Sequence, residues 1–479
     1  MAVLEGLEPR GVLHWFEELC RIPHGSGNTK AISDYLVRFA RDRGLAVRQD
    51  EWNNVVIKKP ASAGYEAAAP VLLQGHMDMV CEKEADCKKD MAAEGLELAV
   101  EGDTVYAKGT TLGGDDGIAV AMILALLESD ALPHPALEAV LTVDEETGMI
   151  GAAAIDLSDL RGRLLINLDS EVEGVFTAGC AGGATAVIDI PVKREPFTGE
   201  SLSITVSGLA GGHSGIEINR GRANAVVLLG RVLDAVGRAT PMRLYSVSGG
   251  SKDNAIPVSA CAFAAVEDGE RVAAACRRME EVFRREYAVA DGNVTITAAP
   301  CQAETQPLDT DSTRRALTLL QCAPNGVQEM SREVEGLVQI SLNLGILTTS
   351  ADSVRASFCV RSNINSQKEM LLHRLELLSA VLGGSFSVSG AYPAWEYRAD
   401  SPLRRLMAEV FAEQCGHAPT VEVIHAGVEC GLLADKLSGL DCVSIGPDLT
   451  EIHTPRERMH IASVQRTWAL LTETLRRLR

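Results

Sequence analysis

The chain has 479 residues, of which 46% are hydrophobic and 23% charged, and its formal net charge is −20. This length predicts two to four domains, and the composition is typical of a globular protein. Nucleic acids and anionic membranes both need a basic protein face, so the acidic balance argues against either as a partner.

The cysteines and the N-terminus bear on the compartment. The 12 cysteines are scattered without a C-x-x-C pair, as is typical of reduced thiols in a reducing compartment. The first ten residues include Glu5 and Glu8 and lack a basic region followed by an apolar run, so we expect no signal peptide. No apolar stretch reaches the ~18–20 residues that span a bilayer. The sequence therefore predicts a cytoplasmic protein.

In the first part of the chain, short apolar runs alternate with helical patterns. Helices are expected over residues 28–43 and 118–128. Such alternation predicts an α/β fold with a mostly parallel sheet, covered by helices on both faces. The buried strands are expected at residues 55–57, 71–73, 139–143 and 164–168.

From residue 187 the pattern changes to alternating apolar and polar residues, which is typical of half-exposed antiparallel strands. A capping box, Ser366-x-x-Glu369, predicts the start of a helix over residues 367–382. We expect residues 187–396 to form an α+β domain inserted into a first domain of residues 1–186 and 397–479. The other elements are expected as strands at 201–206, 293–297, 336–344 and 353–360 and a helix at 223–236.

After residue 396, apolar strands and helical patterns alternate again, as they do in the first part of the chain. Ser401 and Pro402 suit the N-cap and first position of a helix. A buried strand is expected at residues 442–445, and an amphipathic helix from Ser463 closes the chain.

A glycine-rich loop at residues 109–117 leads directly into the helix at 118–128. A loop of this kind often holds phosphate on the N–H groups of the helix N-terminus. Here it contains Asp115 and Asp116 and no lysine, and carboxylates favour a divalent cation over a phosphate. The alternative is that the two aspartates only cap the helix and complement its dipole.

Histidines and carboxylates follow several of the predicted strands. In open α/β sheets, ligands bind at the carboxyl ends of the strands. Two imidazoles and three or four carboxylates can hold two divalent ions, with one carboxylate bridging them. Each group also has an ordinary interpretation, as loop polarity or a solvated turn. The strand-end groups are His76, Asp78, Asp115, Glu145, Glu146, Asp169 and His453.

Several stretches appear in one order along nearly the whole chain, and together they resemble a known family. They include GHMDMV at 75–80, KGTTLGGDDGI at 108–118, DEETGMIGA at 144–152 and HAGVECG at 425–431. Further matches lie at 166–170, 179–183, 208–215, 444–447 and 453–455. They resemble the dinuclear-metal peptidase and aminoacylase family, and within it the group of aminoacyl-histidine dipeptidases, also called cytosolic non-specific dipeptidases.

The resemblance implies a zinc-exopeptidase-like catalytic domain with a lid and dimerisation domain inserted at residues 187–396. It implies two divalent metal ions per subunit, zinc being expected and manganese or cobalt the alternatives. One ion would be held by His76 and Asp169 and the other by Glu146 and His453. Asp115 would bridge them and precede a cis peptide bond to Asp116.

The catalytic roles also come from the resemblance. Asp78 would orient His76, and Glu145 would be the general base that takes a proton from a water shared by the two ions. His213, Asn254 and Arg361 of the inserted domain would bind the substrate together with Gly427, which follows the insertion. Arg355 is a rival to Arg361 for binding the substrate's terminal carboxylate.

The expected activity is hydrolysis of unblocked dipeptides, including Xaa-His dipeptides, by a homodimer. Two alternatives lie in the same family, a tripeptide aminopeptidase and an N-acyl amino-acid amidohydrolase. A third is a non-catalytic metal-binding scaffold.

Overall fold

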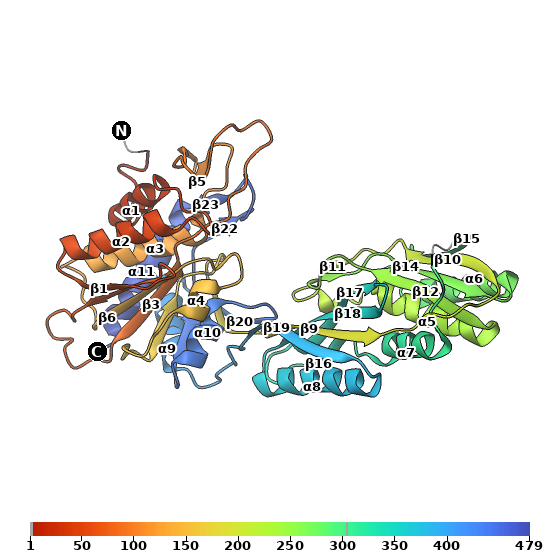
Figure 1. Cartoon of the computed structure of the whole chain (residues 1–479). Helices are drawn as coiled ribbons and strands as arrows, with labels where there is room; N and C mark the ends of the chain where they lie inside the picture. Colours follow the sequence, from red (N-terminus) through yellow and green to blue (C-terminus); the bar gives the residue numbers. More distant parts are fainter. Residues whose placement is uncertain (1–2, 303–304) are drawn as a thin grey trace. The chain divides into compact units, whose positions relative to one another are not determined.

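The computed structural model describes residues 3–302 and 305–479, which form two compact units (Figure 1). The boundary expected at residue 187 falls inside strand β9 (Gly182–Pro191). The short segment Ile424–Gly427 also belongs to the second unit. The first unit comprises Met1–Gly179, Tyr397–Val423 and Val428–Arg479, and the second comprises Cys180–Glu396 and Ile424–Gly427.

The first unit is built on an eight-stranded sheet in the order β1-β2-β6-β3-β7-β21-β8-β20. The neighbours β6, β3, β7 and β21 are parallel, whereas β1, β2 and β8 pair in antiparallel fashion. The predicted α/β class with a parallel sheet is therefore confirmed, with antiparallel strands toward its edges. The strands are β1 (Ala46–Gln49), β2 (Val55–Lys59), β3 (Val71–His76), β6 (Leu137–Thr142), β7 (Leu164–Asn167), β8 (Val175–Cys180), β20 (Thr420–Ile424) and β21 (Asp441–Ser444).

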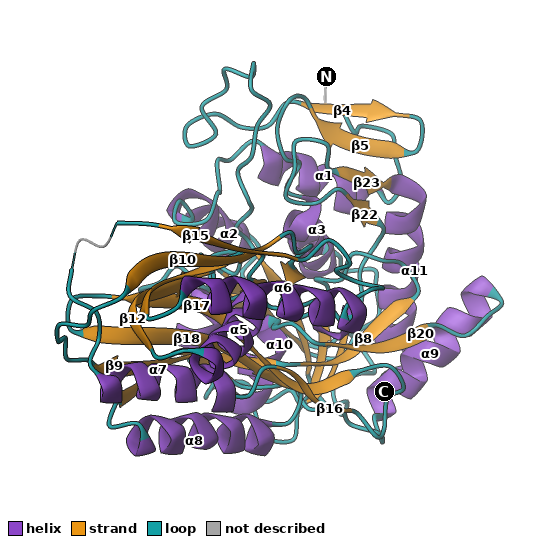
Figure 2. Ribbon diagram, turned by 90° about the vertical axis from the view of Figure 1, so that its right-hand side faces the viewer, coloured by secondary structure: helices purple, strands orange, loops and turns teal. Residues whose placement is uncertain are grey.

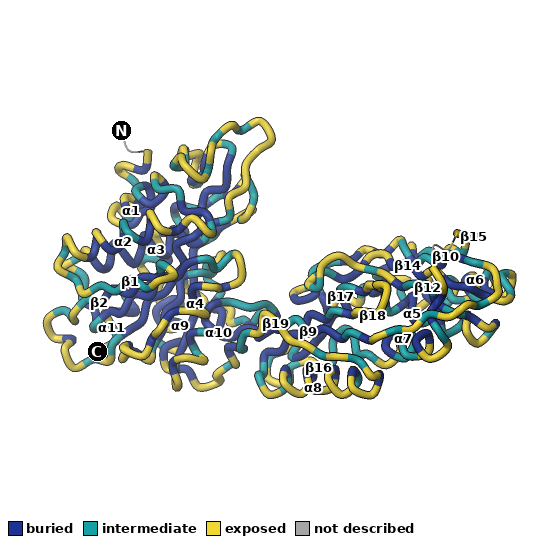
Figure 3. The backbone as a smooth tube through the Cα atoms, in the orientation of Figure 1, coloured by how far each residue is buried: buried dark blue, intermediate teal, exposed yellow. Residues whose placement is uncertain are grey.

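Helices and a small second sheet complete this unit. The apolar side chains of the central strands and of the flanking helices share one buried core. Figure 3 marks the buried residues along the backbone in dark blue. A four-stranded sheet in the order β22-β23-β5-β4 lies beside it. These elements are α1 (Arg10–Cys20), α2 (Lys30–Asp42), α3 (Gly114–Glu128), α4 (Ile150–Ala154), α9 (Pro402–Cys415), α10 (Glu429–Lys436), α11 (Ile461–Arg477), β4 (Leu98–Glu101), β5 (Thr104–Ala107), β22 (Leu449–Thr450) and β23 (Arg458–His460).

The register of the parallel strands aligns their carboxyl ends. Val71 of β3 lies opposite both Leu137 of β6 and Leu164 of β7, so the residues that follow the three strands meet at one edge. Gly75, near the end of β3, brings α3 close to this edge. A Cβ atom there would lie 2.8 Å from the Cβ of Ala119, so any larger residue would push the helix away.

Two helix starts were predicted from capping residues, with different outcomes. The Ser401 side chain accepts a hydrogen bond from the backbone N–H of Arg404 at 3.0 Å, which confirms the N-cap before Pro402. The prediction of a capping box at Ser366 is wrong. Helix α8 (Asn365–Val381) begins two residues before the predicted start at 367, and its N-cap is Ile364, whose side chain makes no capping hydrogen bond. The chain therefore enters α8 without a polar cap from Ser366.

The second unit has a nine-stranded antiparallel sheet packed against helices, shown in Figure 2. Its main strand order is β15-β10-β14-β12-β17-β18-β9-β19, with β16 paired to β17. The predicted α+β pattern of alternating strands matches this arrangement. The elements are β10 (Glu200–Ser207), β11 (Gly212–His213), α5 (Ala225–Ala239), β12 (Met242–Gly249), β13 (Ala255–Ile256), β14 (Ala260–Val266), α6 (Gly269–Glu286), β15 (Thr295–Pro300), α7 (Thr310–Cys322), β16 (Gly326–Met330), β17 (Val338–Thr349), β18 (Ser353–Ser362) and β19 (Ser385–Tyr392), with a 3-10 turn at Ile218–Arg220.

Several helices had no clear signal in the sequence. In α6, for example, only Val272, Cys276 and Phe283 are buried, so its apolar stripe is thin. Within residues 3–302 and 305–479, no helix is both long enough and apolar enough to cross a membrane.

Candidate metal centre

Loops at the carboxyl edge of the first unit's sheet bring the predicted metal-binding side chains together. His76 ends β3, Glu145 and Glu146 follow β6, and Asp169 follows β7. The other two predicted ligands lie outside these strands. Asp115 is at the start of α3, and His453 is in the loop between β22 and β23. Three groups have ligand atoms within 4.8 Å of one another: His76 with Asp116 and Asp169, His76 with Glu145 and Glu146, and Asp115 with Glu146 and His453.

Asp115 lies between the two histidines. Its Oδ1 is 3.1 Å from Nε2 of His76, and its Oδ2 is 3.1 Å from Nε2 of His453. Although burial acts in the opposite direction, hydrogen bonds from the two imidazoles hold the pKa of Asp115 well below its usual range. The peptide bond from Asp115 to Asp116 is cis. One carboxylate therefore faces two imidazoles with opposite oxygens, as a bridging ligand does.

The buried His76 has distinct partners for its two ring nitrogens. Its Nδ1 lies 3.0 Å from the backbone oxygen of Asp78 and 3.5 Å from the Asp78 carboxylate. A neutral imidazole that donates from Nδ1 keeps the Nε2 lone pair for a cation. On that side, Nε2 is 3.5 Å from Oδ1 of Asp169.

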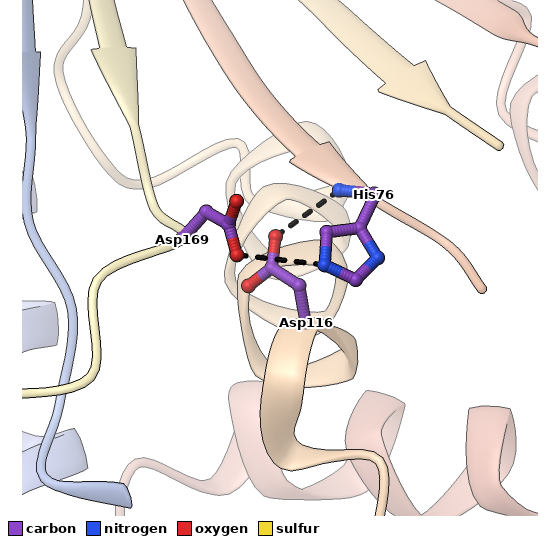
Figure 4. Close-up of side chains that lie close together, drawn as sticks. All are labelled: His76, Asp116 and Asp169. Carbon is purple, nitrogen blue, oxygen red and sulfur yellow. Dashed lines mark hydrogen bonds and ion pairs between the residues drawn. The ribbon is translucent and has the colours of Figure 1, made fainter. Parts of the chain in front are cut away.

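Asp116 also belongs to this cluster, although the family resemblance gives it no ligand role and places it only after the cis peptide bond. Its Oδ2 accepts a hydrogen bond from the backbone N–H of His76 at 3.1 Å, as Figure 4 shows together with Asp169. Burial and the charge of Asp169 raise the pKa of Asp116 well above its ordinary value. Burial likewise raises the pKa of Asp169 to about 6. Buried carboxylates so close together repel one another, which a bound cation relieves.

The pair of Glu146 and His453 fits a cation as well. Oε1 of Glu146 is buried and accepts no hydrogen bond within the described chain, although Nε2 of His453 is 2.8 Å away. The neighbouring carboxylates of Asp115 and Glu146 raise the pKa of His453 to about 10. Imidazole and carboxylate ligands together suit zinc, manganese and cobalt. The imidazoles and carboxylates at this edge therefore suit divalent ions. Oε1 of Glu146, which accepts no hydrogen bond, is available as a ligand atom.

Glu145 lies beside these groups without being tied to them. Its backbone N–H donates to Oδ1 of Asp78 at 3.2 Å, while the other Asp78 oxygen accepts from the Ser26 hydroxyl at 2.8 Å. Burial raises the pKa of the Glu145 carboxyl to about 9. Asp78 thus contacts His76 mainly through its backbone, and its carboxylate holds the loop of Glu145. A divalent cation acts on Glu145 in the opposite direction to burial and favours the carboxylate form.

A second layer of polar side chains, which no strand-end pattern in the sequence predicted, lies next to the site. The buried Glu429 accepts hydrogen bonds from the Gln74 amide and the Thr142 hydroxyl, both at 2.6 Å. Gln74 in turn accepts from the side chain of Asn167 at 2.5 Å. Glu429 lies in the stretch 425–431 that carries the family resemblance, which was the available signal. These bonds join the ends of β3, β6 and β7.

In the second unit, Arg361 is buried and its Nε has no hydrogen-bond partner among the described residues. Its Nη1 donates to the hydroxyl of Tyr392 at 3.2 Å. Gly427 packs on the same Tyr392, since a Cβ atom there would lie 2.5 Å from the tyrosine ring. Arg355 is instead exposed. It lies on the same strand six residues before Arg361, which corresponds to roughly 20 Å along the strand. Tyr392, which the sequence analysis did not identify, therefore joins Arg361 and Gly427, whereas Arg355 lies apart.

His213 lies near this cluster. A Cβ atom on Gly215 would lie 2.9 Å from the ring of His213 and 3.2 Å from Nε of Arg361, so these side chains are neighbours. Burial and the charge of Arg361 lower the pKa of His213. Asn254 is exposed, and its backbone oxygen accepts a hydrogen bond from the N–H of Ser214 at 2.9 Å. The structure therefore brings His213, Arg361 and Gly427 together. The backbone of Asn254 adjoins that of His213, because the next residue, Ala255, pairs with His213.

Imidazoles and carboxylates around one shared aspartate, at the carboxyl edge of a parallel sheet, are typical of metal-dependent hydrolases. The chain belongs to peptidase family M20/M25/M40, whose model matches residues 72–477. The family predicted from the sequence is therefore confirmed.

Individual relatives support the same assignment. The chain is 36% identical to the cytosol non-specific dipeptidase of Escherichia coli K12, over 100% of this chain and 99% of that protein. It is similar to the crystal structure of an aminoacylhistidine dipeptidase from Vibrio alginolyticus, with a TM-score of 0.94 and 35% identity, covering 99% and 98% of the two chains. Aminopeptidase PepT from Bacillus cereus shares the fold, with a TM-score of 0.57 and 15% identity over 98% of each chain.

Proposed function

We propose that the protein is a metal-dependent dipeptidase that hydrolyses unblocked dipeptides, including Xaa-His dipeptides. The observation that carries this proposal is the position of Asp115, whose two oxygens each lie 3.1 Å from a different imidazole. The relatives that match the whole chain bear dipeptidase names, which favours a dipeptide over a tripeptide or an N-acyl amino acid.

The proposed metal ligands are those of the sequence analysis. His76 and Asp169 would hold one ion, Glu146 and His453 the other, and Asp115 both. When bound, two such ions polarise a carbonyl and lower the pKa of water. We propose zinc as the native metal, because imidazole and carboxylate ligands suit it, with manganese and cobalt as alternatives.

Glu145 is the proposed general base. Its side chain has an oxygen within 4.8 Å of the ligand atoms of His76 and Glu146, so it reaches the space where those side chains converge. A carboxylate there accepts a proton from an attacking water and can return it to the leaving amine. The Asp78 carboxylate keeps Glu145 in place by accepting a hydrogen bond from the backbone N–H of Glu145 at 3.2 Å.

The second unit is proposed to recognise the substrate. The buried Arg361 carries an unused Nε–H and is suited to the terminal carboxylate of a dipeptide, because a guanidinium binds a carboxylate bidentately. We assign the same purpose to His213, Asn254 and Gly427 from the family resemblance of their motifs. The domains proposed are a catalytic domain of residues 1–186 and 397–479 and a lid and dimerisation domain of residues 187–396. We further propose a homodimer that acts in the cytoplasm.

Metal content and turnover test the proposal together. Purified protein should contain divalent ions, and β-alanyl-histidine and Ala-His hydrolysis should disappear on chelation and return when Zn²⁺, Mn²⁺ or Co²⁺ is added. Tripeptides and N-acetylated amino acids, measured side by side, should be poor substrates. If kcat/KM were higher for tripeptides than for dipeptides, the protein would be a tripeptide aminopeptidase. If it were higher for N-acetylated amino acids, the protein would be an N-acyl amino-acid amidohydrolase. Sedimentation of the purified protein tests the dimer.

A further inference from the structure

The glycine-rich loop that precedes α3 already holds an anion, and that anion is part of the protein. The carboxylate of Glu457 accepts hydrogen bonds from four successive backbone N–H groups. Its Oε2 lies 2.7 Å from the nitrogen of Leu112 and 3.1 Å from that of Gly113. Its Oε1 lies 2.8 Å from the nitrogen of Gly114 and 3.4 Å from that of Asp115.

These N–H groups would otherwise lack partners. The first N–H groups of a helix have no acceptor within the helix, and Gly113 at the N-cap of α3 has no side chain to supply one. Successive N–H groups in such a turn form a concave site for an anion, and the helix dipole favours negative charge there. Glu457 is only 2% exposed and comes from more than 340 residues further along the chain.

Glu457 shares a short segment with His453. Both lie between β22 and β23, where the backbone N–H of Glu457 donates to the oxygen of Thr454 at 3.1 Å. This segment therefore contacts Asp115 twice. His453 approaches the Asp115 carboxylate at 3.1 Å, and Glu457 contacts its backbone N–H.

We propose that Glu457 is a positioning residue for the metal centre. By occupying the anion site of the loop, its carboxylate holds Asp115 in the orientation that joins His76 to His453, and the affinity for divalent ions depends on it. This inference rests on the proposed function, because it takes Asp115 to be a metal ligand. A residue that only capped α3 would affect folding stability without changing metal affinity.

The test is the Glu457→Gln variant of the full-length chain. Glutamine preserves the volume but replaces one acceptor oxygen with an NH₂ group, which points hydrogens at the N–H groups of the loop. Metal-free protein is titrated with Co²⁺ alone, and the visible absorption of the bound ion gives the dissociation constant. We expect Glu457→Gln to weaken Co²⁺ binding by about 10- to 100-fold, the usual effect of losing a partner behind a metal ligand.

Glu138→Gln is the matched control. Glu138 is also a buried glutamate that accepts backbone N–H groups, from Arg161 at 3.0 Å and Gly162 at 2.8 Å. It lies near the start of β6 (Leu137–Thr142), whereas the metal-binding residues follow the end of that strand. We expect this variant to lower the unfolding temperature and to leave the Co²⁺ dissociation constant within about twofold of the wild type.

A milder variant covers the case in which Glu457→Gln does not fold. In Gly114→Ala, the new Cβ atom would lie 3.1 Å from Oε1 of Glu457 and 3.2 Å from Leu449, so the carboxylate must shift slightly. The expected result is weaker Co²⁺ binding than in the wild type, by a smaller factor than for Glu457→Gln. If Glu457→Gln and Gly114→Ala bind Co²⁺ with wild-type affinity, counting only a variant that folds, the positioning role of Glu457 is refuted. The metal site itself would be unaffected by that result. A wild-type protein that binds no Co²⁺ would overturn the metal site itself, and this inference with it.

Discussion

Replacing Glu145 by glutamine separates the proposed base from the metal ligands beside it. Within the described residues, the Glu145 carboxylate accepts no hydrogen bond, and the residue is held through its backbone N–H by Asp78 at 3.2 Å. Glutamine has the same shape and keeps that backbone bond. The substitution should therefore remove the proton acceptor and leave the fold and the other carboxylates as they are.

The expected loss follows from the role. A positioned general base contributes about 10²- to 10⁴-fold to the rate. At about 1.4 kcal/mol per factor of ten, this corresponds to roughly 3–5 kcal/mol of the activation free energy. The group of Asp115, Glu146 and His453 does not include Glu145, so the metal content should remain close to that of the wild type.

The assay combines two measurements on the same preparation, kcat and KM for Ala-His and metal content by elemental analysis. Glu146→Gln serves as the comparison, since a proposed ligand should lose metal along with activity. If Glu145→Gln kept a kcat within about threefold of the wild type, the general-base assignment would fail. If it lost metal as Glu146→Gln does, Glu145 would instead be a ligand, which its proximity to His76 permits.

Other consequences can be measured with the same protein. Arg361→Lys should raise the KM for dipeptides roughly tenfold or more by losing a bidentate contact, while Arg355→Lys should match the wild type; the reverse order would reassign the carboxylate site. Thermal unfolding of metal-free protein should show stability falling from pH 7 to pH 9. The folded-state pKa is about 9 for Glu145 and about 10 for His453, both above the ordinary values of 4.5 and 6.5, so each stabilises the fold when protonated and this contribution is lost as the pH rises. A constant or rising unfolding temperature over this window would contradict those shifts, and the gap to metal-loaded protein should widen as the pH rises. Ser401→Ala should cost about 1–2 kcal/mol of unfolding free energy by removing the cap of α9, as chemical denaturation would show, and an unchanged midpoint would argue that the cap contributes nothing.

The parallel core of the first unit was predictable because its signals are local. Short apolar runs bounded by turn residues mark β3, β6, β7 and β21, and burial of both sheet faces requires such runs. Parallel strands place their carboxyl ends at one edge, so the polar residues that follow them could be grouped before any coordinates were known. Local signals were weaker for α8, because Ser366 has the residue type of a cap but lies within the helix.

The choice between competing side chains needed the tertiary structure. Arg355 and Arg361 have the same chemistry and lie on one strand, and only burial and the contact with Tyr392 distinguish them. The partners of Asp115 come from distant parts of the chain, His76 at 39 residues and His453 at 338 residues of separation. Periodicity and motif spacing carry no information on such pairings.

The glycine-rich loop at residues 109–117 shows the same division. Its sequence established that the loop has no lysine, that it carries Asp115 and Asp116, and that a helix follows, which favoured a cation over a phosphate. It left open which group satisfies the N–H groups of the loop. The fold supplies Glu457 for them, because the segment between β22 and β23 packs against the start of α3. Residue types and short-range patterns thus determined the chemistry available to this protein, whereas long-range packing decided which atoms meet.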